Sequence, residues 1–153
     1  MSRAFVKEIE DEAIELPDRP VSPHPNFVTE AGRLAIETAL NRFEAAHKAA
    51  IAKGDRNAAA ADLREIRYWR TRLASAQVVE PPADTSCVRF GSTVTVKRRD
   101  GREQTLRIVG EDEANPSRGT ISYVSPLARA VIGRTVGETI EIASEEAVLL
   151  KIG

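Results

Sequence analysis

The sequence predicts an α+β protein in which an N-terminal antiparallel coiled-coil hairpin of helices precedes an antiparallel β-sheet with one short helix. Two periodicities predict this class. Through residues 29–76, apolar and small residues recur at alternating steps of four and three, the spacing of a seam between two helices. From residue 88 onward, apolar and polar residues alternate with a period of two, as they do in half-buried strands.

The composition alone excludes several classes of protein. The 153 residues suffice for one or two small domains, and a formal charge of −1 provides no global field that attracts nucleic acid or an anionic membrane. No apolar run approaches the roughly 20 residues of a membrane span, and acids stand where a signal peptide needs an apolar stretch. The single cysteine, Cys87, fits a reducing compartment, and two histidines add too little for a structural zinc site. We therefore expect a soluble, cytoplasmic monomer.

We expect residues 1–28 to form a separate leader. They are acidic and then rich in proline, with Pro17, Pro20, Pro23 and Pro25 close together. Proline fixes φ and lacks an N–H donor, so this stretch should be extended rather than part of a helix or sheet. A disordered, solvated tail and a partner-binding arm both fit this composition.

Residues 29–80 predict the hairpin, and Thr29 begins its first helix as an N-cap. The two seams consist of Ile36, Leu40, Phe43, His47 and Ala50, and of Leu63, Ile66, Trp69, Leu73 and Ala76. We expect His47 to be packed in its seam. Gly54 and the polar stretch GDRN interrupt the pattern and mark the turn between two antiparallel helices. Arms of about 23 residues would project about 35 Å.

Two prolines end the second helix and open a linker at residues 81–87. In the C-terminal domain, residues 88–153, two alternating stretches flank the dipeptide DG, which predicts a β-hairpin. GTISYVS predicts a third strand, and ETIEIA with EAVLLKI predicts a final strand pair. PLARAVIG predicts a short helix that begins at Pro126, ends at Gly133 and covers one face of a sheet of about five strands.

A series of segments carries a family resemblance. FVTEAGRLAIETAL opens the first helix, SAQVV leaves the second, and FGSTVTV, RIVGEDEA, ISYVSPLARAVIG and VGETIEI follow. In order and spacing, residues 27–152 resemble the bacterial Gre transcript-cleavage factors, GreA and GreB. The resemblance implies an FKBP-like C-terminal domain that docks at the rim of the secondary channel of RNA polymerase. It also implies that the hairpin enters that channel and brings acidic tip residues to the catalytic Mg²⁺, where they help to cleave backtracked RNA.

The resemblance singles out acids at the hairpin tip. The family pattern GDxxEN contains an Asp and a Glu, whereas GDRNAA retains Asp55 and has Ala58 in place of the glutamate. Asp55 is therefore the candidate catalytic and metal-binding carboxylate, shared with the Mg²⁺ of the polymerase, or else only the N-cap of the second helix. In an alternative register, DLREIRYW supplies Asp62 and Glu65 as the tip pair. That register makes the first arm much longer than the second and leaves AKGDRN as an unexplained break.

By resemblance, the loop and helix at residues 125–132 contact a coiled coil of the polymerase. The candidate contact residues are Ser125, Pro126, Ala128, Arg129 and Ile132. Alternatively, the apolar members of this helix only cover the sheet. Basic residues gather in KRRDGR and at Arg64, Arg67, Arg70 and Arg72. For these, contact with polymerase or nascent RNA competes with an ordinary solvated surface.

Three functions follow from these observations. The first is a transcription elongation regulator at the secondary channel, which is not itself an enzyme, has no cofactor of its own, and whose stimulation of cleavage is open. The second is an interaction module of the Rnk type, a group of short-armed relatives labelled regulators of nucleoside diphosphate kinase. The third, a peptidyl-prolyl isomerase, needs an apolar pocket walled by aromatics, and the C-terminal part offers only Phe90 and Tyr123. We favour the first.

Overall fold

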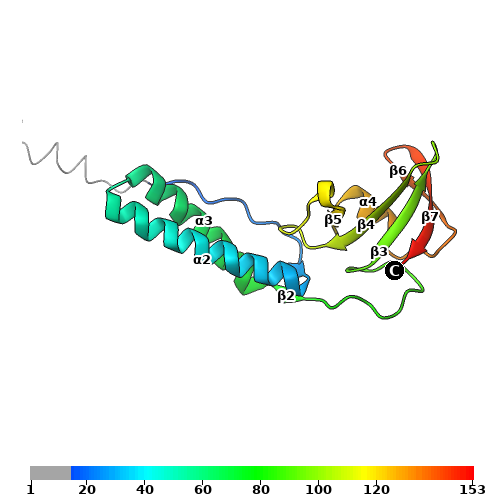
Figure 1. Ribbon diagram of the computed structural model, residues 1–153, viewed down its shortest axis with the longest axis horizontal. Helices are drawn as coiled ribbons and strands as arrows, with labels where there is room; N and C mark the ends of the chain where they lie inside the picture. Colours follow the sequence, from blue (N-terminus) through cyan, green and yellow to red (C-terminus); the bar gives the residue numbers. More distant parts are fainter. Residues whose placement is uncertain (1–14) are drawn as a thin grey trace, which may run out of the picture.

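The computed structural model describes residues 15–153, in which a helical hairpin and a β-sheet domain form an elongated molecule (Figure 1). The predicted leader falls partly on residues 1–14, which lie outside the described residues. Within residues 15–153, no helix combines the length and the apolar character that a membrane crossing requires.

Helices α2 (Glu30–Lys53) and α3 (Arg56–Ser75) pack antiparallel, as the seam pattern predicts (Figure 1). At 1.5 Å per residue they extend about 36 and 30 Å. The buried residues of the pair include Ile36, Leu40, Ala50, Ala59, Ala60 and Ile66. His47 is half-buried. Leu63, predicted in the seam, is 39% exposed, because two helices alone cannot enclose a long side chain at the margin of their contact.

The sheet has the strand order β5-β4-β3-β7-β6. Its strands are β3 (Thr93–Arg98), β4 (Glu103–Val109), β5 (Thr120–Ser122), β6 (Thr139–Ile142) and β7 (Glu145–Ile152). The predicted DG hairpin is β3 and β4, and β6 with β7 is the predicted final pair. One pairing differs from the antiparallel prediction, because β5 pairs parallel with β4. The chain crosses back after β4 through a loop that contains the 3-10 helix η1 (Pro116–Arg118), so it enters β5 in the direction of β4.

Helix α4 (Pro126–Val131) packs against the sheet and contributes to the main core of this domain (Figure 1). The core contains Val88, Val94, Val96, Leu106, Ile108, Ala128, Val131, Ile140 and Leu149. Along β3, Val94 and Val96 are buried and alternate with less buried residues, as predicted, whereas β4 buries Leu106, Ile108 and also the adjacent Val109. The described structure therefore confirms an α+β fold with a helical hairpin followed by a sheet and one short helix.

The base of the hairpin is closed by a small two-stranded sheet of its own. Strands β1 (Phe27–Val28) and β2 (Gln77–Val78) pair parallel where the chain enters and leaves the hairpin. Two residues are too few to show alternation, so sequence reasoning missed this pair. Residues 15–26 form neither helix nor strand and run alongside α3 (Figure 1).

Candidate functional site

The tip of the hairpin is the turn at Gly54 and Asp55. Gly54 ends α2 in the left-handed conformation, with a φ of 70°, and its amide donates to carbonyls of the last turn. Asp55 begins α3, and its Oδ1 accepts from the Ala58 amide at 3.1 Å, which satisfies one orphan donor of the helix. The carboxylate at the predicted tip position therefore acts as an N-cap.

One carboxylate is a small donor set for a metal ion. Mg²⁺ prefers octahedral oxygen coordination, and one oxygen of Asp55 already accepts a backbone hydrogen bond. Among residues 15–153, no group of three or more histidine, cysteine, aspartate or glutamate side chains is placed to hold a metal. The tip does not fit a metal site of its own, and a Mg²⁺ ion at Asp55 would need most of its ligands from a partner.

The alternative acids, Asp62 and Glu65, lie on the shaft of α3. At 1.5 Å per residue they stand about 10 and 15 Å from Asp55 along the helix axis. Glu65 Oε2 accepts from Arg19 Nη1 at 2.7 Å and from Trp69 Nε1 at 3.2 Å, so this carboxylate is already paired. The break that this register left unexplained is the hairpin turn itself. In this fold Asp62 and Glu65 lie within α3 rather than at the turn.

The predicted docking surface surrounds the start of α4. Ser125 Oγ accepts from the Ala128 amide at 3.3 Å and caps the helix, and Pro126 occupies the first turn, where no N–H is needed. Pro126, Arg129 and Ile132 are exposed. Ala128 requires a correction, because it is fully buried in the core of the sheet domain and its side chain is not available to a partner. The short helix must turn one face to the sheet, and Ala128 lies on that face.

A buried polar cluster that sequence reasoning missed joins α3 to the loop after β4. Arg72 is 1% exposed, and its Nε donates to Asp112 Oδ2 at 2.5 Å while its Nη2 donates to Asn26 Oδ1 at 2.7 Å. Tyr68 donates its hydroxyl to the same Asp112 carboxylate. Burial, and then this hydrogen bond, raise the pKa of Tyr68 to about 12. Arg72, grouped with surface arginines in the sequence, therefore holds the hairpin to the sheet domain.

The same loop makes a second contact, through Glu113. Its carboxylate accepts from both the amide and the hydroxyl of Thr29, the N-cap of α2. A Cβ atom on Gly32 would lie 2.0 Å from Glu113 Oε2, and one on Gly110 would lie 2.5 Å from the Phe27 carbonyl oxygen, so neither position accepts a side chain without a shift. The segments FVTEAG and VGEDEA, far apart in the sequence, meet here.

Known proteins match this chain over both of its parts. Residues 83–152 match the profile of the family described as Transcription elongation factor, GreA/GreB, C-term. The transcription elongation factor GreA of Chloroflexus aggregans is 32% identical over 147 residues, which cover 82% of this chain and 92% of that relative. The chain belongs to the GreA/GreB family. The family resemblance of the sequence segments is thereby confirmed.

Other GreA/GreB relatives match a shorter stretch. The transcription elongation factor GreB of Neisseria meningitidis is 44% identical over 85 residues, 54% of this chain and 52% of the relative. The chain thus spans about half the length of the first curated relatives that it matches. Among solved structures, GreA factor homolog 1 (Gfh1) of Thermus thermophilus covers 85% of this chain and 99% of its own, at 19% identity and a TM-score of 0.41.

This GreA/GreB family member has three parts that bear on its function. The tip comprises Gly54 and Asp55, the docking surface lies at the start of α4, and the joint comprises Arg72, Asp112 and Glu113 with their partners. Figure 1 shows the α2–α3 turn at the end of the hairpin that points away from the sheet domain. A partner that contacts both the docking surface and the tip must therefore be large, because the shaft between them is about 30 Å long.

Proposed function

We propose that this GreA/GreB family member regulates transcription elongation by binding RNA polymerase at the rim of its secondary channel. The sheet domain docks through the exposed residues at the start of α4, and the hairpin enters the channel toward the active site. Family membership and the projection of the hairpin from the sheet domain support this proposal. The protein is an accessory factor, and any cleavage of RNA is carried out by the polymerase with its own Mg²⁺.

The number of acids at the tip bears on whether the protein stimulates cleavage of RNA. Hydrolysis by two metal ions requires carboxylates that hold a hard cation and orient the attacking water. The tip supplies only Asp55, whose carboxylate caps α3, and Ala58 stands where the resemblance expects a glutamate. We therefore propose a protein that occupies the channel and slows nucleotide addition, without efficient stimulation of cleavage.

A backtracked polymerase complex tests this proposal. The protein is added with Mg²⁺, and binding, RNA length and nucleotide addition are measured for the wild type and for Asp55→Ala, with Asp62→Ala as the control on the shaft. We expect binding and slower addition, without shortened RNA. Efficient shortening that disappears only in Asp55→Ala would show that a single tip acid suffices, and it would overturn the non-stimulating part.

The Rnk-type interaction module is the second candidate. The tip with a single acid favours it, whereas the Gre-like opening of the first helix argues against it. Failure of the wild-type chain to bind polymerase in the same assay would reject the first function and leave this one.

A further inference from the structure

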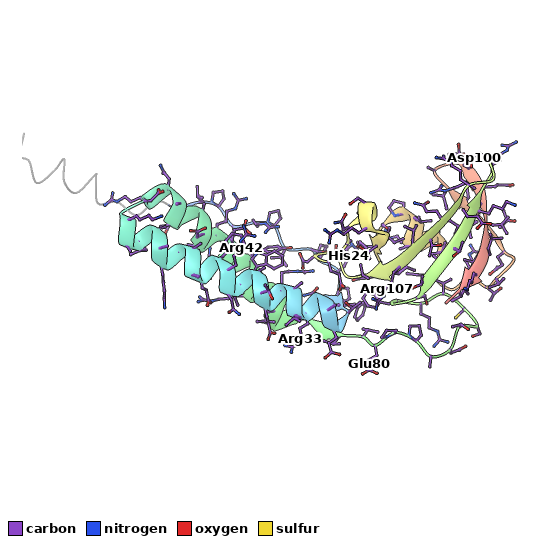
Figure 2. The ribbon with its side chains drawn as sticks, in the orientation of Figure 1. His24, Arg33, Arg42, Glu80, Asp100 and Arg107 are labelled. Atoms are coloured by element: carbon purple, nitrogen blue, oxygen red, sulfur yellow. The ribbon has the colours of Figure 1, made fainter. Side chains whose placement is uncertain are left out.

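Residues 15–26, the N-terminal segment, contact both parts of the molecule. The segment runs alongside α3 and reaches the sheet domain just before β1 (Figure 1). Figure 2 labels His24, a residue of this segment, in the region between the hairpin and the sheet domain. A solvated tail would not be expected to make specific side-chain contacts with both parts of the molecule.

At the hairpin end, Arg19 is the main contact. Its Nη1 donates to Glu65 Oε2 at 2.7 Å, and its guanidinium lies 3.7 Å from the centroid of the Tyr68 ring and 5.7 Å from that of Trp69. A planar guanidinium can stack on an aromatic ring and donate to a carboxylate at the same time, which an ammonium group does less well. Asp18 adds an ion pair with Arg67 at 2.5 Å. These contacts fix the segment to one face of α3.

At the sheet end, the segment contacts the loop after β4 and the end of β5. Ser22 Oγ donates to Glu111 Oε1 at 3.0 Å, and the Tyr123 hydroxyl donates to the Pro25 carbonyl. Asn26, which is buried, accepts from Arg72 and donates to the carbonyl of the same residue. The segment is thus attached to α3, to the joint and to the sheet domain.

The composition of the segment suits a stiff connector. Its four prolines lack an N–H donor, so the backbone can lie along a helix without leaving these groups unpaired. An extended proline-rich chain spans about 3.1 Å per residue, so the stretch from Asp18 to Asn26 covers about 25 Å. Both of these residues are held by side-chain contacts. Two attachment points this far apart resist bending of the hairpin relative to the sheet domain.

We propose that residues 15–26 form a brace that sets the angle between the hairpin and the sheet domain, with Arg19 as its positioning residue. The consequence for transcription rests on the proposed function: the brace aims the tip along the polymerase channel. An error of about an ångström at the reacting groups can change a rate a hundredfold, so the direction of a 30 Å shaft matters.

Distances between spin labels at the two ends of the molecule test the brace directly. Labels are attached at Ile51→Cys, near the tip and 62% exposed, and at Arg99→Cys in the β3–β4 turn, in a Cys87→Ser background. We expect a single narrow distance distribution that becomes at least about twofold wider in Arg19→Ala, with little change in melting temperature. Arg19→Lys should be intermediate, because lysine keeps the charge but not the planar stacking.

Two further variants keep this test decisive. Arg33→Ala removes an arginine that pairs with Glu37 on α2, away from the segment, and should leave the distribution unchanged. The double variant Pro20→Gly with Pro23→Gly loosens the connector without touching Arg19 and should widen the distribution. A distribution of wild-type width in both Arg19→Ala and the double proline variant would overturn the brace.

The functional consequence has its own measurement. With polymerase at saturating protein, Arg19→Ala should bind within about twofold of the wild-type Kd, because docking uses the sheet domain, yet its maximal slowing of nucleotide addition should fall about twofold or more. An unchanged maximal effect would overturn the aiming role. If the wild type itself does not bind polymerase, the proposed function fails, and the label distances still decide the brace.

Discussion

Ala143 and Ser144 form the turn between β6 and β7, and both have positive φ, 51° and 67°. The left-handed conformation brings Cβ close to the backbone, which costs most L-residues about 1–2 kcal/mol. Two-residue hairpin turns of this kind usually contain glycine or asparagine. The turn between β3 and β4, by contrast, has Gly101 at a φ of 87°. The β6–β7 turn therefore carries local backbone strain, whereas glycine relieves it in the β3–β4 turn.

Ser144→Gly should stabilise the protein by about 0.5 kcal/mol, because relief of the strain exceeds the extra entropy that glycine adds to the unfolded chain. Urea unfolding followed by circular dichroism measures this change. Gly101→Ala serves as the opposite control and should destabilise the protein by about 1 kcal/mol. A destabilising Ser144→Gly would show that the serine side chain, not the backbone, determines the stability of this turn.

Tyr68 should give the protein a dependence on alkaline pH. Its pKa is about 12 in the folded state, above the ordinary value of 10.0. A raised folded pKa means that the folded state holds the proton more tightly, so the stability from Tyr68 is full below pH 10 and is lost as pH rises toward 12. Ultraviolet titration of Tyr123→Phe, in which Tyr68 is the remaining tyrosine, should give a midpoint near 12 when folded and near 10 in urea. A folded midpoint near 10 would contradict both the burial of Tyr68 and its hydrogen bond to Asp112.

Two neighbouring residues determine both where the helices of the hairpin meet and which side chains its tip presents. α2 ends because Gly54 adopts the left-handed conformation, and α3 begins because Asp55 caps it. The same two residues define the tip that a partner would meet. Capping occupies one oxygen of Asp55, so an efficient metal-assisted role for this turn requires a second acid.

Ala58→Glu supplies that acid at the third position of α3. We expect it to produce Mg²⁺-dependent shortening of backtracked RNA, since it restores the pair in the family pattern. Stability should change by less than about 1 kcal/mol, because the helix dipole favours an acid here while Asp55 repels it. Ala61→Glu, an exposed position farther along α3, is the matched control and should leave RNA length unchanged. Polymerase binding without shortening in Ala58→Glu would show that the reach of the hairpin, not its acid content, limits cleavage.

The whole molecule depends on the joint between the hairpin and the sheet domain. Arg72, Asp112 and Asn26 come from three separate segments, and Glu113 binds the start of α2. A buried charge is stable only when it is paired and hydrogen-bonded, which these contacts achieve. The joint therefore links the hairpin to the sheet domain, and the β1–β2 pair ties the two ends of the hairpin to each other.

Arg72→Met keeps most of the side-chain volume but leaves the Asp112 carboxylate without its cation. We expect a loss of about 3 kcal/mol in the free energy of unfolding, since removal of one partner of a buried ion pair is costly. Fluorescence of Trp69, the single tryptophan, and far-ultraviolet circular dichroism can follow the unfolding. Arg70→Ala, which removes an exposed pair with Glu44, is the control and should cost less than about 1 kcal/mol. Equal losses in both variants would contradict the special role of Arg72.

The periods of three to four and of two, the DG turn and the position of Pro126 were enough to predict the hairpin, most strands and the short helix. These features depend on local backbone geometry and on which face of an element is apolar. Residues that are close together in the sequence determine both properties. The place of Asp55 at the tip also follows from local signals, because a glycine and a cap residue end one helix and start the next.

The remaining features depend on which distant segments meet, and no local pattern contains that information. Arg72 belongs to a run of arginines that look alike in sequence, yet only this one is enclosed by the loop after β4. Ala128 is buried and Pro126 is exposed because the position of the sheet determines which face of α4 is covered. The parallel pairing of β5 and the path of residues 15–26 along α3 likewise arise only when the two parts of the molecule pack together, since their contacts join residues tens of positions apart.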